Sequence, residues 1–223
     1  HPLQGQLAAK LASMSGLQRA FFCNSGTEAV EACLKFARRY WYSKGIRNRT
    51  RYVALEHGFS GRTMGALSVT ANAHYREPFE PLLEDVYWVP YGDARAVELE
   101  LKKAKQVGLK IGAVVIEPLQ GEAGAVVPPD DYWPRLRKIC DKYEVLLIAD
   151  EVQSGMGRTG RWWAIQHAGV EPDIVTTAKG IASGMPLGAF IARDSVMTWP
   201  AGAHGSTFAG NPICAAAGKA TMD

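Results

Sequence analysis

Two charged side chains stand at the ends of apolar runs: Asp150 closes the run that begins at Val145, and Lys179 follows the run 173–178. A carboxylate in such a place needs a cation, a metal ion or several N–H donors to stay ionised. A buried lysine is costly unless it is paired, deprotonated or used covalently, and burial lowers the pKa of its amine toward nucleophilic competence. The pair therefore suggests an acid that holds a cation beside a nucleophilic amine, with an ordinary loop lysine as the alternative.

A third feature is a candidate anion site at Ser25, Gly26 and Thr27, between a predicted strand and a predicted helix. Free backbone N–H groups and the positive end of the helix dipole would bind a phosphate there. The alternative is that Ser25 and Glu28 form an S-x-x-E capping box, which only completes the helix. Phosphate site, lysine and acid are what pyridoxal phosphate requires, because a lysine forms its Schiff base and an acid pairs with its pyridine nitrogen. The combination favours that cofactor.

The segment 145–160 allows two other interpretations. A metal-holding ATPase strand would need G-x-x-x-x-G-K-[ST] elsewhere, but the only Gly-Lys pair, Gly218-Lys219, is followed by alanine. The residues from Gly155 to Gly160 match the dinucleotide fingerprint G-x-G-x-x-G, yet four residues separate them from the strand and no acid follows about 20 residues later. The five histidines show no zinc-binding spacing, so we expect no metal site.

The elements that would position these residues alternate along the chain. Short apolar runs separated by helix-length connections indicate a mostly parallel sheet with helices on both faces, an α/β fold. The predicted strands span 19–23, 51–56, 86–90, 112–118, 145–150, 173–178 and 189–192, and the predicted helices span 27–42, 94–107, 131–143, 161–168 and 211–221.

Polar clusters follow five of these strands. Ligands of open α/β sheets bind beyond the carboxyl ends of the strands, so the clusters are expected to meet at one edge of the sheet. They are residues 24–28, 57–63 and 119–122, Asp150 and Lys179.

Composition excludes some function classes. The 223 residues are 47% apolar, enough for a sizeable core, and we expect one domain. A net charge of +3 is too small to indicate nucleic acid or an anionic membrane as the main partner. The basic, aromatic stretch 38–51 is interpreted as a helix end followed by a solvated loop.

Cysteine use and chain ends give further expectations. Cys23, Cys33, Cys140 and Cys214 form no C-x-x-C pair and are expected to be reduced core residues, which favours the cytoplasm. No apolar run reaches 18 residues and no leader pattern opens the chain, so we expect neither a membrane span nor a signal peptide. The first residue is His1 and the last residues lie in a predicted helix, so we expect a fragment of a longer protein.

Six motifs together resemble the class III aminotransferases of the ornithine, acetylornithine and 4-aminobutyrate type, which are pyridoxal-phosphate enzymes of fold type I. The resemblance covers essentially the whole chain. It implies that residues 1–223 are the cofactor-binding large domain, truncated at both ends, without the small domain. The motifs are NSGTEAVEACLKFAR, HGFSGRTMGALS, IEPLQGEAG, IADEVQSGMGRTG, TTAKGIASGMPLGA and HGSTFAGNP.

The resemblance implies roles around the cofactor ring. Lys179 would form the Schiff base and then move the proton between the substrate carbon and C4′ of the cofactor. Asp150 would keep the pyridine nitrogen protonated. Val152 and Phe59 would sandwich the ring, and Gln153 would lie near its phenolic oxygen.

The resemblance also implies phosphate and substrate contacts. Ser25, Gly26 and Thr27 would form the phosphate site, joined by Thr207 of a neighbouring subunit, because family members are homodimers with shared sites. Arg62 would bind a substrate carboxylate, for which a bidentate guanidinium is suited, with a surface-loop arginine as the alternative.

The resemblance also suggests roles for two glutamates. Glu122 resembles the residue that pairs with an arginine of the small domain and swings aside for dicarboxylates. That arginine is not in this chain, so an exposed, unpaired carboxylate is the alternative. Glu117 is expected to order the site rather than to react.

The implied activity is transfer of an amino group from an ω-amino donor to 2-oxoglutarate, a 2-oxo acid acceptor, by a ping-pong mechanism. Gln153 favours the acetylornithine, ornithine and 4-aminobutyrate branches, and the general pattern favours acetylornithine. A 4-aminobutyrate or other ω-amino acid aminotransferase remains an alternative. A dinucleotide-binding oxidoreductase and a catalytically incomplete domain are hypotheses from other classes.

Overall fold

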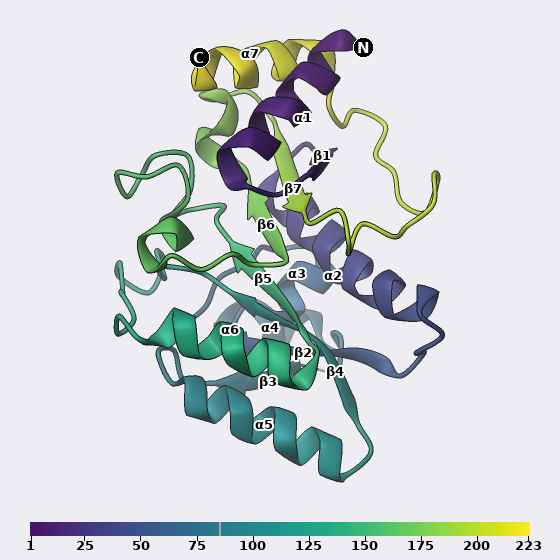
Figure 1. Cartoon of the computed structure of the whole chain (residues 1–223), viewed down its shortest axis with the longest axis vertical. Helices are drawn as coiled ribbons and strands as arrows, with labels where there is room; N and C mark the ends of the chain where they lie inside the picture. The colour runs from purple at the N-terminus through teal and green to yellow at the C-terminus, as the bar shows by residue number, and fades with distance from the viewer. Residues whose placement is uncertain (85) are drawn as a thin grey trace.

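A twisted sheet forms the centre of the computed structural model, which describes residues 1–84 and 86–223 (Figure 1). Among these residues the sheet has seven strands in the order β1-β7-β6-β5-β4-β2-β3. Strand β7 is antiparallel to both of its neighbours, and the other neighbours pair in parallel, which confirms a mostly parallel sheet. The strands are β1 (Arg19–Cys23), β2 (Arg49–Leu55), β3 (Val86–Val89), β4 (Lys110–Ile116), β5 (Leu146–Asp150), β6 (Ile174–Thr177) and β7 (Gly188–Ala192).

The strands divide the core into two layers because successive side chains of a strand point to opposite faces. In β2, for example, Val53 and Leu55 join one buried cluster, and Tyr52 and Ala54 join the other. Helices α1 (Pro2–Ser15), α5 (Ala94–Gln106), α6 (Tyr132–Tyr143) and α7 (Pro212–Met222) cover the first cluster, and α2 (Gly26–Ser43) with α3 (Met64–Ser68) covers the second. Helices therefore lie on both faces, as predicted.

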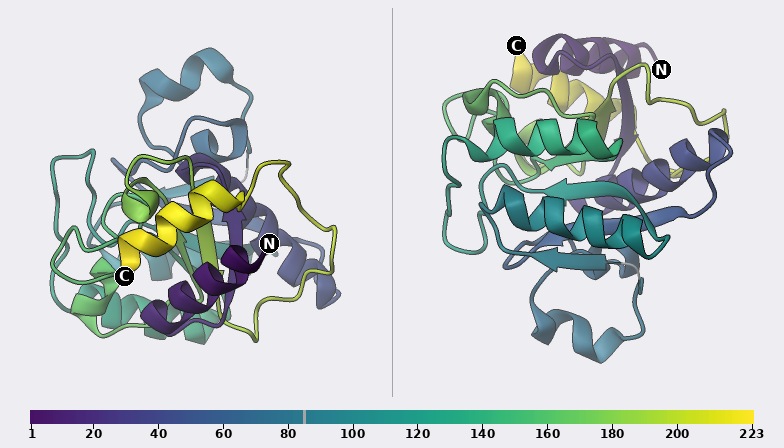
Figure 2. Two further views of the ribbon diagram at one scale, coloured as in Figure 1. Left: turned by 90° about the horizontal axis from the view of Figure 1, so that it is seen from above. Right: turned by 60° about the horizontal axis from the view of Figure 1, so that its bottom comes forward.

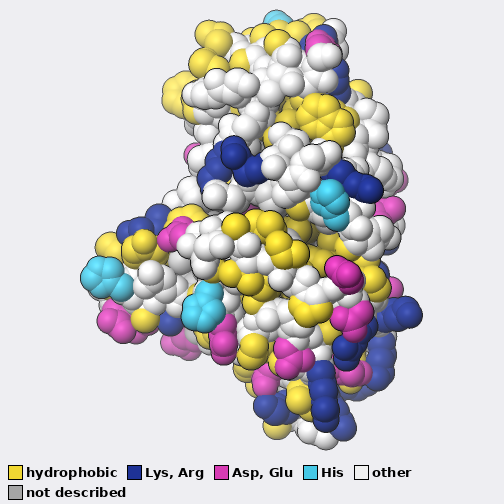
Figure 3. All heavy atoms as spheres, turned by 90° about the vertical axis from the view of Figure 1, so that its left-hand side faces the viewer, with side chains coloured by type: hydrophobic (Ala, Val, Ile, Leu, Met, Phe, Trp, Pro, Cys, Tyr) yellow, Lys and Arg dark blue, Asp and Glu magenta, His cyan; other side chains and the backbone are white. Residues whose placement is uncertain are grey.

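The figures show this arrangement. Helices α5 and α6 lie in front of the sheet in Figure 1, and α1 and α7 lie side by side in Figure 2, where they pack against each other. Acidic and basic side chains are interspersed over the lower part of the face shown in Figure 3. In the part of the chain that the structure describes, no helix has the length and apolar character of a membrane span.

The predicted elements are confirmed for all seven strands and for α2, α5, α6 and α7, with ends that differ by at most two residues. The predicted helix 161–168 is wrong, because 161–163 are bends after Gly160, whose φ is 86°, and only the 3-10 helix η2 (Ala164–Ala168) follows. Five elements were not predicted: α1, α3, α4 (Ala73–Arg76), η1 (Glu77–Phe79) and η3 (Lys179–Ala182).

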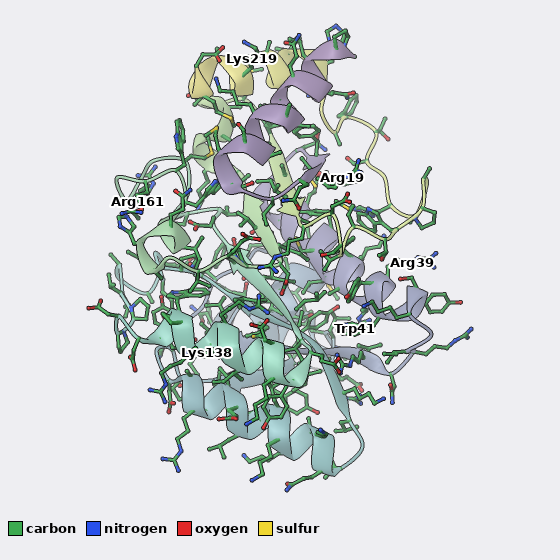
Figure 4. All side chains as sticks on the ribbon, in the orientation of Figure 1. Arg19, Arg39, Trp41, Lys138, Arg161 and Lys219 are labelled. Atoms are coloured by element: carbon green, nitrogen blue, oxygen red, sulfur yellow. The ribbon has the colours of Figure 1, made fainter. Side chains whose placement is uncertain are left out.

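The basic segment at the end of α2 uses its cations locally. Arg49 stacks over the Trp41 ring at 3.9 Å, and Lys44 lies over the Tyr40 ring at 4.6 Å. Both rings are buried, so the cations cover the outer side of the core. Trp41 and Arg39 are labelled at this end of the helix in Figure 4. This arrangement fits the interpretation of the stretch as a helix end and a loop.

One buried ion pair ties α6 to the sheet. Asp173, just before β6, accepts hydrogen bonds from the Leu147 backbone N–H (2.8 Å) and from Nη1 of Arg137 on α6 (2.9 Å). Nε of Arg193 lies 3.7 Å from the other oxygen of Asp173.

The four cysteines are buried and free, which confirms the prediction that they are core residues.

Candidate active site

A pocket of about 760 Å³ opens at the carboxyl ends of β1, β2, β4, β5 and β6. These five strands run in the same direction, so the polar segments that follow them meet at one edge of the sheet. Every site residue expected from the sequence lines this pocket except Thr207, which is exposed in the segment before α7. The lining includes Ser25, Gly26, Thr27, Phe59, Arg62, Glu117, Glu122, Asp150, Val152, Gln153 and Lys179.

Asp150 forms the floor of the pocket at the end of β5. Its residue is only 3% exposed, and its Oδ1 accepts hydrogen bonds from the Thr176 hydroxyl (2.9 Å) and the Val152 backbone N–H (3.2 Å). Burial raises the pKa of this carboxyl, and the two hydrogen bonds oppose that effect. A cation in the pocket would therefore stabilise the ionised form.

Lys179 follows β6 in a left-handed backbone conformation with φ 46°. The sequence led us to expect a buried lysine, and this is wrong, because the residue is exposed and lines the pocket. Its ammonium donates a hydrogen bond to Oε1 of Gln153. Desolvation by the pocket walls lowers the pKa of the amine, while the nearby Asp150 and Glu117 carboxyls oppose the shift. The site thus increases the fraction of neutral, reactive amine relative to a free lysine, although Asp150, Glu117 and Glu122 all oppose the shift.

The anion site lies at the start of α2. Ser25 is the N-cap and accepts a hydrogen bond from the Glu28 N–H (3.3 Å). In a complete capping box the Glu28 side chain would accept the backbone N–H of Ser25. Here it accepts the backbone N–H of Asn24 (2.9 Å), one residue before the N-cap. Gly26 and Thr27 occupy the first two helical positions, whose N–H groups have no acceptor within a helix. Capping and anion binding are therefore compatible here.

Two glycines allow the close packing around this helix start. A Cβ on Gly26 would lie 2.6 Å from Cγ1 of Val152, and one on Gly188 would lie 2.3 Å from the backbone oxygen of Ser25. Helix α2 thus begins in direct contact with both β7 and the segment after β5. This contact fixes the anion site relative to Asp150.

Glu117 connects two loops at the pocket wall. Its carboxyl oxygens accept hydrogen bonds from the N–H of Phe59 (2.9 Å) and of Gly121 (3.4 Å). Burial, with a contribution from the charge of Asp150, raises the pKa of Glu117 to about 8. Its place fits the expectation that it orders the site.

Arg62 and Glu122 lie at the rim and are both exposed. The guanidinium of Arg62 stacks on the Tyr75 ring at 4.0 Å, and Tyr75 in turn meets Phe59 edge to face, with ring centroids 6.4 Å apart. Arg62 is therefore supported on an aromatic surface rather than free in a loop. Glu122 also borders a second hollow next to the pocket.

The glycines of the G-x-G-x-x-G match lie outside the pocket. Gly157 and Gly160 have φ values of 85° and 86°, so they turn the chain. Glu151 is buried and accepts hydrogen bonds from the N–H groups of Ala164 (3.0 Å) and Ile165 (2.8 Å), which fastens this turn to η2. The structure gives the dinucleotide and metal-strand interpretations no support. Within residues 1–84 and 86–223, no group of three His, Cys, Asp or Glu side chains is placed to hold a metal ion.

Sequence reasoning missed part of the pocket wall. Residues 184–187 close one side of it, whereas Asn24 and Ser60, which also line it, belong to the predicted clusters 24–28 and 57–63. The small residues after Lys179 indicated that this segment approaches the site. The apolar side chains of Met185, Pro186 and Leu187 gave no indication in the sequence that they would line the pocket.

Comparisons with known proteins show which proteins the chain resembles. The model of the family "Aminotransferase class-III" matches residues 1–223. The acetylornithine aminotransferase of Methanopyrus kandleri is 50% identical over 207 residues, which are 92% of this chain and 50% of that protein.

Two solved structures are also similar. One is a thermostable (S)-enantioselective omega-transaminase from Thermomicrobium roseum, at 36% identity and a TM-score of 0.93, covering 100% of this chain and 55% of that one. The other is the ornithine aminotransferase from Toxoplasma gondii, described with partial occupancy of PLP at its active site, at 34% identity and a TM-score of 0.91, covering 98% of this chain and 51% of that one. The chain thus spans about half the length of the relatives it matches.

Proposed function

The chain belongs to the class III aminotransferases, a pyridoxal-phosphate-dependent family, and from this we propose that it carries the cofactor site of an aminotransferase. The proposed reaction moves an amino group from an ω-amino donor of the acetylornithine or ornithine type to 2-oxoglutarate by a ping-pong mechanism. One observation carries the proposal: Lys179, Asp150 and the first turn of α2 line the same pocket.

The residues of the pocket fit pyridoxal phosphate. The N–H groups of Gly26 and Thr27 suit its phosphate, because they are the free donors at the positive end of α2. The buried Asp150 suits a protonated ring nitrogen, which would supply the cation that its burial demands. Lys179 suits the aldehyde. When bound, the cofactor supplies an electron sink for charge that develops on the substrate carbon.

Several side chains would prepare the site for this chemistry. The lowered pKa of Lys179 increases the fraction of neutral amine, which can attack a carbonyl and later carry a proton at the substrate carbon. Gln153 orients that amine by accepting its hydrogen bond. Val152, packed on Gly26, and Phe59, held through its N–H by Glu117, would contact the two faces of the ring.

The substrate assignment rests on the rim of the pocket and on the relatives. Arg62 on its Tyr75 support is placed to bind a substrate carboxylate bidentately. Similarity to an acetylornithine aminotransferase supports an acetylornithine-like donor. A 4-aminobutyrate-type donor is the alternative. Glu122 at the rim is proposed to contact the distal end of the substrate or a residue beyond this chain.

The wider organisation is also proposed. Residues 1–223 would form the large domain of a longer cytoplasmic protein. Two subunits would share their sites as a homodimer, with Thr207 of one reaching the phosphate of the other. The exposed position of Thr207 outside its own pocket is compatible with this role.

The direct test is to add pyridoxal phosphate, reduce with borohydride and locate the cofactor by peptide mass spectrometry. We expect the modification on Lys179, and we expect both it and the visible absorption of the bound cofactor to disappear in Lys179→Ala. The matched control is Lys219→Ala on α7, where the lysine is paired with Asp223. Modification of wild type at another lysine would contradict the proposal. A bound cofactor that no amino donor bleaches would instead indicate a catalytically incomplete domain.

A further inference from the structure

Glu31 on α2 caps a different helix. Its Oε1 accepts hydrogen bonds from the backbone N–H groups of Gly65 (2.7 Å) and Ala66 (3.1 Å), the first residues of α3 after Met64. The side chain of Thr63, which occupies the N-cap position of α3, makes no capping hydrogen bond. A carboxylate from α2 therefore does the work that an N-cap side chain usually does.

The same carboxylate closes a chain of hydroxyl hydrogen bonds. The Thr63 hydroxyl donates to Oε1 of Glu31 (2.6 Å), which uses the only hydrogen of that hydroxyl. In the 2.8 Å contact between the hydroxyls of Thr27 and Thr63, Thr27 must therefore be the donor. Oγ1 of Thr27 in turn accepts the backbone N–H groups of Arg62 and Thr63, each at 3.3 Å.

Two glycines make this junction tight. A Cβ on Gly61 would lie 2.4 Å from Oγ1 of Thr27, and a Cβ on Gly65 would lie 2.3 Å from Oε2 of Glu31. The backbone of the segment 61–66 therefore touches α2 directly on both sides of Arg62. Such contact leaves the segment little room to move relative to the helix.

We propose that Glu31 is a positioning residue, which acts through Thr63 and Thr27 to hold the segment 61–66 so that Arg62 presents its guanidinium at the mouth of the pocket. The proposal rests on the proposed function of Arg62 as the binder of a substrate carboxylate. It also assigns the Thr27 hydroxyl to this segment, which leaves phosphate binding to the backbone N–H groups of Gly26 and Thr27.

The test compares Glu31→Ala with Glu31→Gln in the full-length enzyme loaded with pyridoxal phosphate. We expect Glu31→Ala to raise KM for the carboxylate-bearing donor about tenfold, which corresponds to ~1.4 kcal/mol, with a much smaller change in kcat. Glu31→Gln keeps a carbonyl oxygen for the same donors and should restore most of the affinity. If Glu31→Ala is poorly folded, Thr63→Ala breaks the link to Thr27 and leaves the cap of α3 intact.

Two further arms separate positioning from general stability. The KM for a monoamine donor without a carboxylate should not change in Glu31→Ala. In a double-mutant cycle with Arg62→Ala, the loss caused by Glu31→Ala should largely vanish, because both act on one interaction. The same cycle can be measured without catalysis, from the affinity of each variant for a dicarboxylate determined by calorimetric titration.

The outcomes are distinct. Equal KM increases for both kinds of donor, full additivity in the cycle, or no effect of Glu31→Ala would overturn the positioning role. An Arg62→Ala variant with unchanged KM for the carboxylate donor would instead overturn the proposed function of Arg62.

Discussion

Replacement of Glu117 by glutamine should change how the stability of the protein depends on pH. Burial raises the pKa of this carboxyl from 4.5 to about 8, so in that interval the folded protein holds a proton that the unfolded chain has lost. The free energy of unfolding that Glu117 contributes therefore falls as the pH rises from 4.5 to 8. Each pH unit accounts for about 1.4 kcal/mol, so the whole interval is worth at most ~5 kcal/mol.

The Glu117→Gln variant has no such proton to lose. At pH 5 it should be slightly less stable than wild type, by ~0.5–1 kcal/mol, because its amide nitrogen would face one of the two backbone donors, the N–H of Phe59 or Gly121. As the pH rises to 8 the difference should shift in favour of the variant by at least ~2 kcal/mol. The variant should therefore become the more stable protein near neutral pH.

Urea denaturation at pH 5, 6, 7 and 8 measures this difference, provided that both proteins have the same dependence of free energy on urea at each pH. A stability difference that stays constant across the series would refute the reasoning. A constant difference would mean that the Glu117 carboxylate is already ionised in the folded state throughout this pH range and is stabilised by its two N–H donors.

Two substitutions elsewhere test the packing that supports the site. Gly188→Ala should lower the free energy of unfolding by at least ~2 kcal/mol and weaken binding of pyridoxal phosphate. The reason is that the added Cβ would meet the Ser25 backbone, which cannot move aside. Equal urea midpoints for the variant and wild type would contradict this. Arg137→Met should lower the free energy of unfolding by ~3 kcal/mol, because it leaves Asp173 buried without its 2.9 Å partner. Adding Asp173→Asn should recover part of this stability, as measured by thermal denaturation. A double variant less stable than Arg137→Met would argue against the ion pair.

The strands could be predicted because each is a short apolar run buried on both faces, a property that the sequence carries locally. Helix α1 could not be recognised by periodicity, since Leu7 and Leu11 are its only buried residues and Gly5 interrupts it. Its end signals were present: Pro2 stands at the first helical position, and Gly16 ends the helix with φ 76°. The helix is supported by contact with α7, about 200 residues later in the chain, which no local pattern shows.

The residues that line the site were easier to predict than the contacts that hold them in place. The rule that ligands gather at the carboxyl ends of parallel strands brought Lys179, Asp150 and the start of α2 together without a structure. The cap that Glu31 provides for α3 was not predictable, because the two helices meet only after α2 and the loop that follows β2 have been folded over the sheet. Such a contact depends on how α2 and the segment after β2 pack together, which no local pattern in the sequence reveals.

The neighbouring acids Asp150 and Glu151 show how the fold separates residues of one chemical type. Successive side chains of an extended chain point to opposite sides, so the first acid enters the pocket and the second enters the interior behind it. There Glu151 accepts N–H groups from η2, while Asp150 faces the pocket that Lys179 lines. A metal ion bound by both acids would need the two carboxylates on one side. The alternation at the end of β5 thus excludes an ion shared by the two acids. Glu151 stabilises the fold, and Asp150 faces the pocket.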